Sequence, residues 1–165
     1  MKILHISDIH FGVPCFKPKK LLSKRFVGML NYLFNRRRIY QYESLKKLGP
    51  SIEKRHIDYI IFTGDFATTS LEEEFVFGKN FLNSLEKYVR KIFIVPGNHD
   101  LYIRETAKEK LFERFFSDYL GEPLTKGALF PYSKEIDGEI VIVGVNSAMP
   151  MPFYSSEGFV SLDTI

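Results

Sequence analysis

The chain has 165 residues and a mean hydropathy of −0.10; 45% of its residues are hydrophobic and 26% are charged, with 11 glycines and 8 prolines. This is the length of about one domain, and the composition excludes disordered, collagen-like and fibrous proteins. The net charge is +3, yet residues 11–42 contain eight basic side chains and no acidic one, which leaves 15 basic against 20 acidic residues elsewhere. The composition therefore predicts one acidic globular body with a single basic segment.

Three short apolar runs that stop at polar residues predict buried strands, because a strand buried on both faces is apolar throughout. Two further runs flank Asp137-Gly138, a dipeptide typical of hairpin turns. The five predicted strands, in chain order, are residues 2–7, 58–63, 91–95, 130–136 and 139–146.

Helices are predicted between the first four strands. Residues 42–55 have a helical pattern that Gly49-Pro50 should end or kink, and a capping box that begins at Ser70 precedes a helix running to about Tyr88. A third helical pattern covers about 107–119. The order β-α-β-α-β-α-β-β is that of an α/β protein, in which ligands bind at the carboxyl ends of the strands.

Polar clusters follow the first three strands and offer oxygen and imidazole ligands on short loops. Asp8 and His10 are predicted to hold one metal ion, while Asp65 bridges to a second ion held by Asn98. Mixed carboxylate, imidazole and amide ligands suit Mn²⁺, Fe or Zn²⁺ better than Ca²⁺. Two divalent ions at this place would lower the pKa of a water and clamp the oxygens of a phosphate. The predicted reaction is therefore hydrolysis of a phosphate mono- or diester.

His99 and Asp100 come directly after Asn98 and are the predicted catalytic residues. As an imidazolium, His99 can donate a proton to the leaving alkoxide. Asp100 is expected to fix the tautomer of His99 and to raise its pKa. Asn98 and His99 are also expected to contact the substrate.

The three motifs together resemble the calcineurin-like metallophosphoesterase superfamily, and residues 6–12 and 95–100 are especially similar to its bacterial members. Asp-x-His, Gly-Asp and Gly-Asn-His-Asp stand in the order of that family, each at a predicted strand end. The resemblance implies an α/β layered sandwich of the α/β/β/α type. Residues 1–165 would form a single domain of this kind, represented mainly by its N-terminal part and incomplete at the C-terminal side.

Members of this family usually carry three further metal-binding histidines, two of them in a Gly-His-x-His motif. This chain has 4 histidines, and only His10 and His99 fall in the predicted site, while His5 and His56 are expected to be structural. We therefore expect little phosphodiesterase activity from this chain alone, because a missing C-terminal part or a partner chain would be needed to complete the metal site. The alternative is a non-catalytic binding or scaffold protein that keeps the fold and has lost the centre.

Residues 17–38 are interpreted as a basic amphipathic insertion near the mouth of the site. Three interpretations are open: a helix docked on the acidic body, contact with an anionic membrane surface, or, less favoured, contact with nucleic acid. The residues for membrane or anion contact are Arg36, Arg37 and Arg38.

The sequence also predicts a cytoplasmic location, with peripheral membrane association as one possibility through the basic segment. Every apolar run is shorter than the roughly 18 residues of a membrane span, and Asp8 comes too early for the apolar region of a signal peptide. The single cysteine, Cys15, cannot form an intramolecular disulfide, which agrees with a reducing compartment.

Overall fold

The computed structural model describes residues 1–13, 42–152 and 155–160. The predicted insertion at 17–38, including Arg36, Arg37 and Arg38, lies outside the described residues, so its three interpretations stay predictions.

A parallel three-stranded sheet forms the centre of the described fold. Its strands are β1 (Ile3–Ile6), β2 (Tyr59–Thr63) and β3 (Lys91–Val95), in the spatial order β1-β2-β3. The middle residues of β3 are buried on both faces, as its apolar sequence predicts. β1 differs from the prediction of a buried strand: Ile3 and His5 are exposed, because the second sheet contacts β3 and leaves one face of β1 open in the described part.

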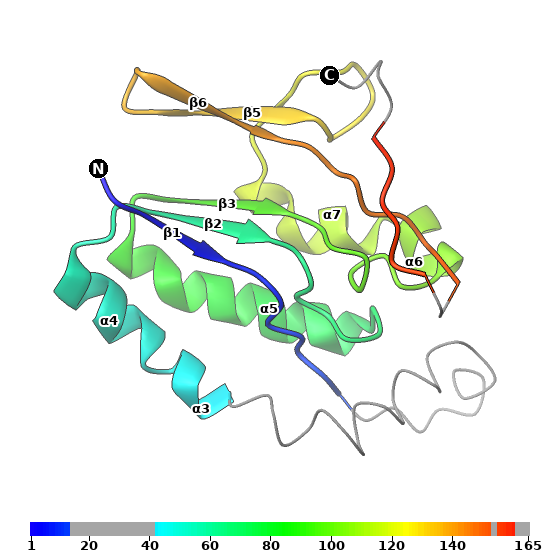
Figure 1. The fold of residues 1–165 in the computed structure, drawn as a ribbon, viewed down its shortest axis with the longest axis horizontal. Helices are drawn as coiled ribbons and strands as arrows, with labels where there is room; N and C mark the ends of the chain where they lie inside the picture. The colour runs from blue at the N-terminus through cyan, green and yellow to red at the C-terminus, as the bar shows by residue number, and fades with distance from the viewer. Residues whose placement is uncertain (14–41, 153–154, 161–165) are drawn as a thin grey trace.

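Helices cover one face of this sheet (Figure 1). They are α3 (Tyr42–Leu45), α4 (Leu48–Arg55) and α5 (Glu72–Leu85), the last continued by the 3₁₀ turn η2 (Glu86–Tyr88). The predicted break at Gly49-Pro50 was wrong, because the proline lies in the first turn of α4, where its missing N–H is not needed. The break comes instead at residues 46–47, between α3 and α4.

The third predicted helix is divided in two. α6 (Arg104–Lys108) and α7 (Leu111–Phe116) are separated at Lys110, whose φ of 50° is left-handed, and the 3₁₀ turn η3 (Ser117–Tyr119) follows α7. α7 packs on α5, and the rings of its two fully buried phenylalanines, Phe112 and Phe116, contact Phe66 from the loop after β2 at tilted angles. The aromatic core thus lies directly beneath the polar loops.

A second, antiparallel sheet lies over the other face of the first, on the side of β3 (Figure 1). Its strands are β4 (Glu122–Pro123), β5 (Tyr132–Ile136) and β6 (Ile140–Gly144). Positive φ angles at Asp137 (50°) and Gly138 (75°) confirm the predicted hairpin turn. The Tyr132 hydroxyl joins the two sheets, since it donates to the Ile94 carbonyl at 2.8 Å and accepts from the Ile94 N–H at 3.1 Å. Helices, a parallel sheet and a second sheet confirm the predicted α/β layered fold.

The start of α5 differs from the predicted capping box. The first turn is capped by Glu74, whose carboxylate accepts hydrogen bonds from the N–H groups of Thr69 (2.8 Å) and Leu71 (3.0 Å) and, more weakly, Val13 (3.4 Å). Glu74 is 1% exposed, and its burial raises its pKa to about 7 even though these hydrogen bonds act in the opposite direction. Ser70, the predicted cap, has a different role, described below.

Glu74→Gln is expected to flatten the dependence of stability on pH. The folded-state pKa of about 7 lies above the ordinary value of 4.5, so this group favours folding most below pH 4.5 and that contribution is lost as pH rises through 7. Urea unfolding between pH 5 and pH 8 should show the variant gaining up to about 3 kcal/mol relative to wild type. Glu72→Gln, in the same turn but exposed, is the control, and an equal slope in all three proteins would contradict the assignment.

Candidate metal centre

The loops after the three parallel strands meet at one edge of the sheet. The first loop runs beside the second: the N–H of Asp8 donates to the Gly64 carbonyl at 3.2 Å and that of His10 donates to the Asp65 carbonyl at 2.8 Å. The pairing continues to Phe11, whose N–H donates to Phe66 at 2.6 Å. These backbone bonds fix both loops before any side chain contributes, as a preorganised site requires.

Three of the predicted ligands have left-handed backbone conformations. The φ angles are 58° at Asp8, 52° at His10 and 57° at Asp65. Such angles are unfavourable for residues with a Cβ and persist only where the surrounding structure holds them. Asp8, His10 and Asp65 are three of the seven non-glycine residues with positive φ among the described residues, and all three lie in the loops that follow β1 and β2.

Two glycines allow the second and third loops to touch. Gly64 has a φ of 86°, and a Cβ at this position would collide with the backbone of Gly97. A Cβ at Gly97 would in turn collide with the carboxylate of Asp65. The glycine in each motif is therefore explained by close approach of the backbone.

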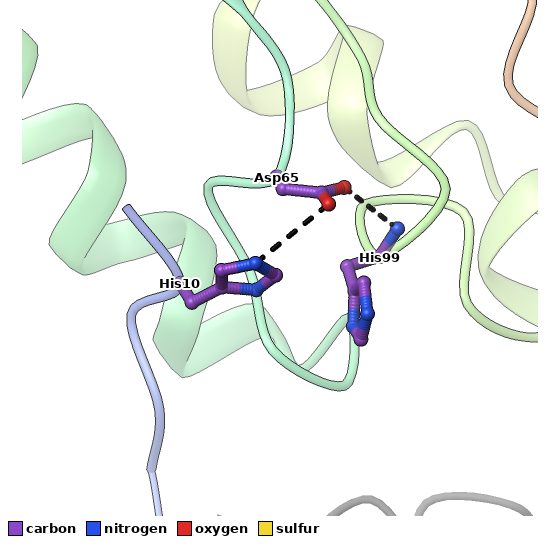
Figure 2. Close-up of side chains that lie close together, drawn as sticks. All are labelled: His10, Asp65 and His99. Atoms are coloured by element: carbon purple, nitrogen blue, oxygen red, sulfur yellow. Dashed lines mark hydrogen bonds and ion pairs between the residues drawn. The ribbon is translucent and has the colours of Figure 1, made fainter. Parts of the chain in front are cut away.

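His10, Asp65 and His99 form one group, with a ligand atom from each lying within 4.8 Å of the others (Figure 2). His10 Nε2 is 3.7 Å from Asp65 Oδ2 and 3.7 Å from Asp8 Oδ1, and the rings of His10 and His99 meet edge to face at 4.7 Å between centroids. The side chains of His10 and Asp65 are only 8% and 13% exposed, whereas that of Asp8 is 65% exposed. Asp8 thus lies at the outer rim of the group.

The orientation of His99 is fixed by groups that the sequence did not identify. Its Nδ1 lies 2.7 Å from the Thr68 carbonyl oxygen, which can only accept, so Nδ1 carries a hydrogen and Nε2 is the nitrogen left for chemistry. Its ring stacks on Tyr102 at 5.3 Å. Its backbone N–H donates to Asp65 Oδ1 at 2.9 Å, which ties the third loop to the bridging carboxylate predicted from the second.

The prediction that Asp100 fixes the tautomer of His99 was wrong. Its carboxylate accepts three backbone hydrogen bonds, from the N–H groups of Asp65 (2.9 Å), Ala67 (2.8 Å) and Gly97 (2.9 Å), and Thr68 is the partner of His99 Nδ1. Asp100 is 0% exposed, and burial raises its pKa to about 8 while the amides act in the opposite direction. Asp100 therefore holds the second and third loops together from below the site.

Ser70 is a further residue whose part in the site was not predicted. Its hydroxyl donates to the His99 carbonyl at 2.8 Å and accepts from the Tyr102 N–H at 2.8 Å. Local sequence favoured a helix cap, which is the commoner use of a serine before an acidic turn. The sequence signal that could have shown this is the run of three polar residues, 68–70, after Gly64-Asp65. In the structure all three of these polar residues are buried.

Asn98 contributes to a cavity that neither His10 nor His99 lines. This cavity of about 410 Å³ is also lined by Asp65 and lies between the ends of β2 and β3 and the chain after β6. The other two histidines lie outside the group: His5 is exposed and contacts the Thr63 hydroxyl at 2.7 Å, and His56 is exposed at the end of α4.

The chemistry of the donor set fits a divalent metal ion. Two imidazoles and a carboxylate offer borderline nitrogen and hard oxygen ligands, the mixture preferred by Mn²⁺, Fe²⁺ and Zn²⁺. The backbone and buried partners described above hold all three ligands in place, as outer partners do in metal sites.

Comparison with known proteins agrees with this geometry. A family model described as calcineurin-like phosphoesterase matches residues 1–158, which include every strand and loop of the site. None of the described helices has the length and apolar character that crossing a membrane requires.

Proposed function

The chain belongs to the calcineurin-like phosphoesterase family, and on this premise we propose that it hydrolyses a phosphate mono- or diester at a centre of two divalent ions. The observation that carries the proposal is the group of His10, Asp65 and His99 at the carboxyl ends of three adjacent parallel strands. Ligands of α/β proteins bind at this end of the sheet.

The proposed ligands are shared between two ions of Mn, Fe or Zn. Asp8 and His10 would hold the first ion, Asp65 would contribute to both, and Asn98 would hold the second from the side of the cavity. Bound divalent ions supply positive charge that neutralises the phosphate oxygens and lowers the pKa of a nearby water.

His99 is proposed to be the general acid. Its Nδ1–H is engaged by the Thr68 carbonyl, so the proton that it gives to the leaving alkoxide would come from Nε2. The same Nε2 can instead be a metal ligand, because His99 belongs to the three-residue group. The two roles predict different results when His99 is replaced.

His99→Ala is expected to affect poor leaving groups far more than good ones. An alkoxide needs the proton, and its loss should lower kcat by about 100-fold or more, whereas 4-nitrophenolate leaves unprotonated and should lose less than about 10-fold. The backbone N–H that contacts Asp65 is kept in the variant. Rates with methyl 4-nitrophenyl phosphate and a dialkyl phosphate, measured beside the affinity for Mn²⁺, check this. An equal loss on both esters together with weaker Mn²⁺ binding would make His99 a ligand.

The proposed function is tested with the purified chain, Mn²⁺ and bis(4-nitrophenyl) phosphate. Slow turnover that requires the metal, with close to two metal ions per chain by elemental analysis, is the expected result. Turnover is expected to be slow because the described residues supply few ligands for two ions, and rapid turnover would contradict that part of the proposal. A chain that binds no metal would instead be the non-catalytic scaffold.

The intended substrate carries a phosphoester, as the family implies. Completion of the centre by further chain or by a partner, contact of residues 17–38 with an anionic membrane and the cytoplasmic location stay predictions of the sequence.

A further inference from the structure

A cavity of about 410 Å³ opens beside Asp65, and neither His10 nor His99 is among the described residues that line it; we call it the Glu157 cavity. Asp65 and Asn98 form the wall shared with the proposed centre, and further lining comes from Val145, Ser147, Ala148 and residues 156–158. A backbone hydrogen bond of 2.9 Å from the Phe159 N–H to the Ser147 carbonyl joins these last two stretches of chain. A phosphate held at Asp65 therefore has room for a substituent on this side.

The charged groups of the Glu157 cavity are all acidic. They are Asp65 and Glu157, while Ser147 and Ser156 add hydroxyls, and no lysine or arginine is among the described residues that line the cavity. Ions bound at the proposed centre would offset the charge of Asp65, which leaves Glu157 as the uncompensated group. A carboxylate in this place attracts a cation and repels a second anion.

We infer that the Glu157 cavity receives the substituent of a phosphodiester that is not the leaving group, and that Glu157 favours a positively charged substituent over an anionic one. The inference rests on the proposed function. It assigns the substrate class: phosphodiesters whose second alcohol carries an amine or a quaternary ammonium group. The cavity is within the size range of small-ligand sites and accommodates a substituent of this size.

Three 4-nitrophenyl phosphodiesters that differ only in their second substituent test the inference. The substituents are choline, which is positive, 3,3-dimethylbutyl, which is neutral and has the same shape, and an alkyl chain of equal length that ends in a carboxylate. Wild type should prefer the choline ester to the neutral one by about 3- to 5-fold in kcat/KM, the effect of one partly screened charge. Glu157→Gln should remove this preference.

Glu157→Lys provides a result that damage to the fold cannot imitate, because it predicts a gain. The charge reversal should raise kcat/KM for the carboxylate ester and lower it for the choline ester, each by about 3- to 5-fold or more. The matched control is Glu139→Lys, which makes the same change of net charge at an exposed position beside the turn of the β5–β6 hairpin. The control should keep the wild-type order of the three esters.

A binding measurement separates this inference from the proposed function. Calorimetry compares choline phosphate with 3,3-dimethylbutyl phosphate on the wild type and on Glu157→Lys. Turnover of all three esters at equal rates, with equal binding of the two phosphates, overturns the inference and leaves the proposed function standing. Tighter binding of choline phosphate that Glu157→Lys reverses supports the inference even if no ester is hydrolysed, in which case the proposed function is what fails. Absence of both turnover and selectivity overturns both.

Discussion

Asp65→Asn is expected to abolish metal-dependent hydrolysis while leaving the protein folded. Asn keeps the size of the side chain and an oxygen that can accept the His99 N–H, so the contact between the second and third loops survives. It loses the negative charge and the second oxygen, which the proposed bridging of two ions requires. Losing several kcal/mol of the transition-state stabilisation that the ions would supply corresponds to a decrease of roughly 1000-fold in kcat/KM.

Initial rates with bis(4-nitrophenyl) phosphate and calorimetric titration with Mn²⁺ measure this effect. Urea unfolding of the metal-free proteins should differ little between the variant and wild type. Asp118→Asn is the matched control, since Asp118 is 75% exposed and pairs with Lys79 far from the three loops. Unchanged Mn²⁺ affinity in Asp65→Asn would contradict the assignment of Asp65 as a ligand.

The three loops of the site could be predicted because their signals are local. A buried strand followed by a glycine and a polar residue specifies where the chain leaves the sheet, and parallel strands bring such points to one edge. His10, Asp65 and His99 are brought together as that reasoning expects, and the hairpin at Asp137 is present. These local signals do not specify the order of the strands within the sheet, so the edge position of β1 was not predicted.

Side-chain partners could not be predicted because they depend on the turn of each loop. His99 and Asp100 are neighbours in sequence, but a turn closed by the Asp100 N–H and the Gly97 carbonyl (3.1 Å) sends the carboxylate of Asp100 beneath the loops while His99 faces Thr68. Ser70 presents the same difficulty. Its hydroxyl could cap α5 or hold the third loop, and only the tertiary packing decides between them.

Asp100→Ala is expected to destabilise the fold strongly. The side chain is fully buried, and its removal leaves three amide N–H groups of two loops without their acceptor. Each buried unsatisfied group costs about 1–3 kcal/mol, so a total loss of about 3–5 kcal/mol in the free energy of unfolding is expected after partial relaxation. Urea unfolding at pH 7 measures this, and a loss below about 1 kcal/mol would contradict it.

Asp100→Asn separates the structural role of this residue from a direct role in catalysis. The amide replaces one oxygen with a donor that faces a backbone N–H, so stability should again fall, by about 1–3 kcal/mol. The tautomer of His99 should stay unchanged in the fraction that remains folded, because its Nδ1 partner is the Thr68 carbonyl. Nitrogen chemical shifts of the His99 ring report the tautomer directly. A switch to the Nε2-protonated form in Asp100→Asn would show that Asp100, and not the Thr68 carbonyl, sets the tautomer of His99.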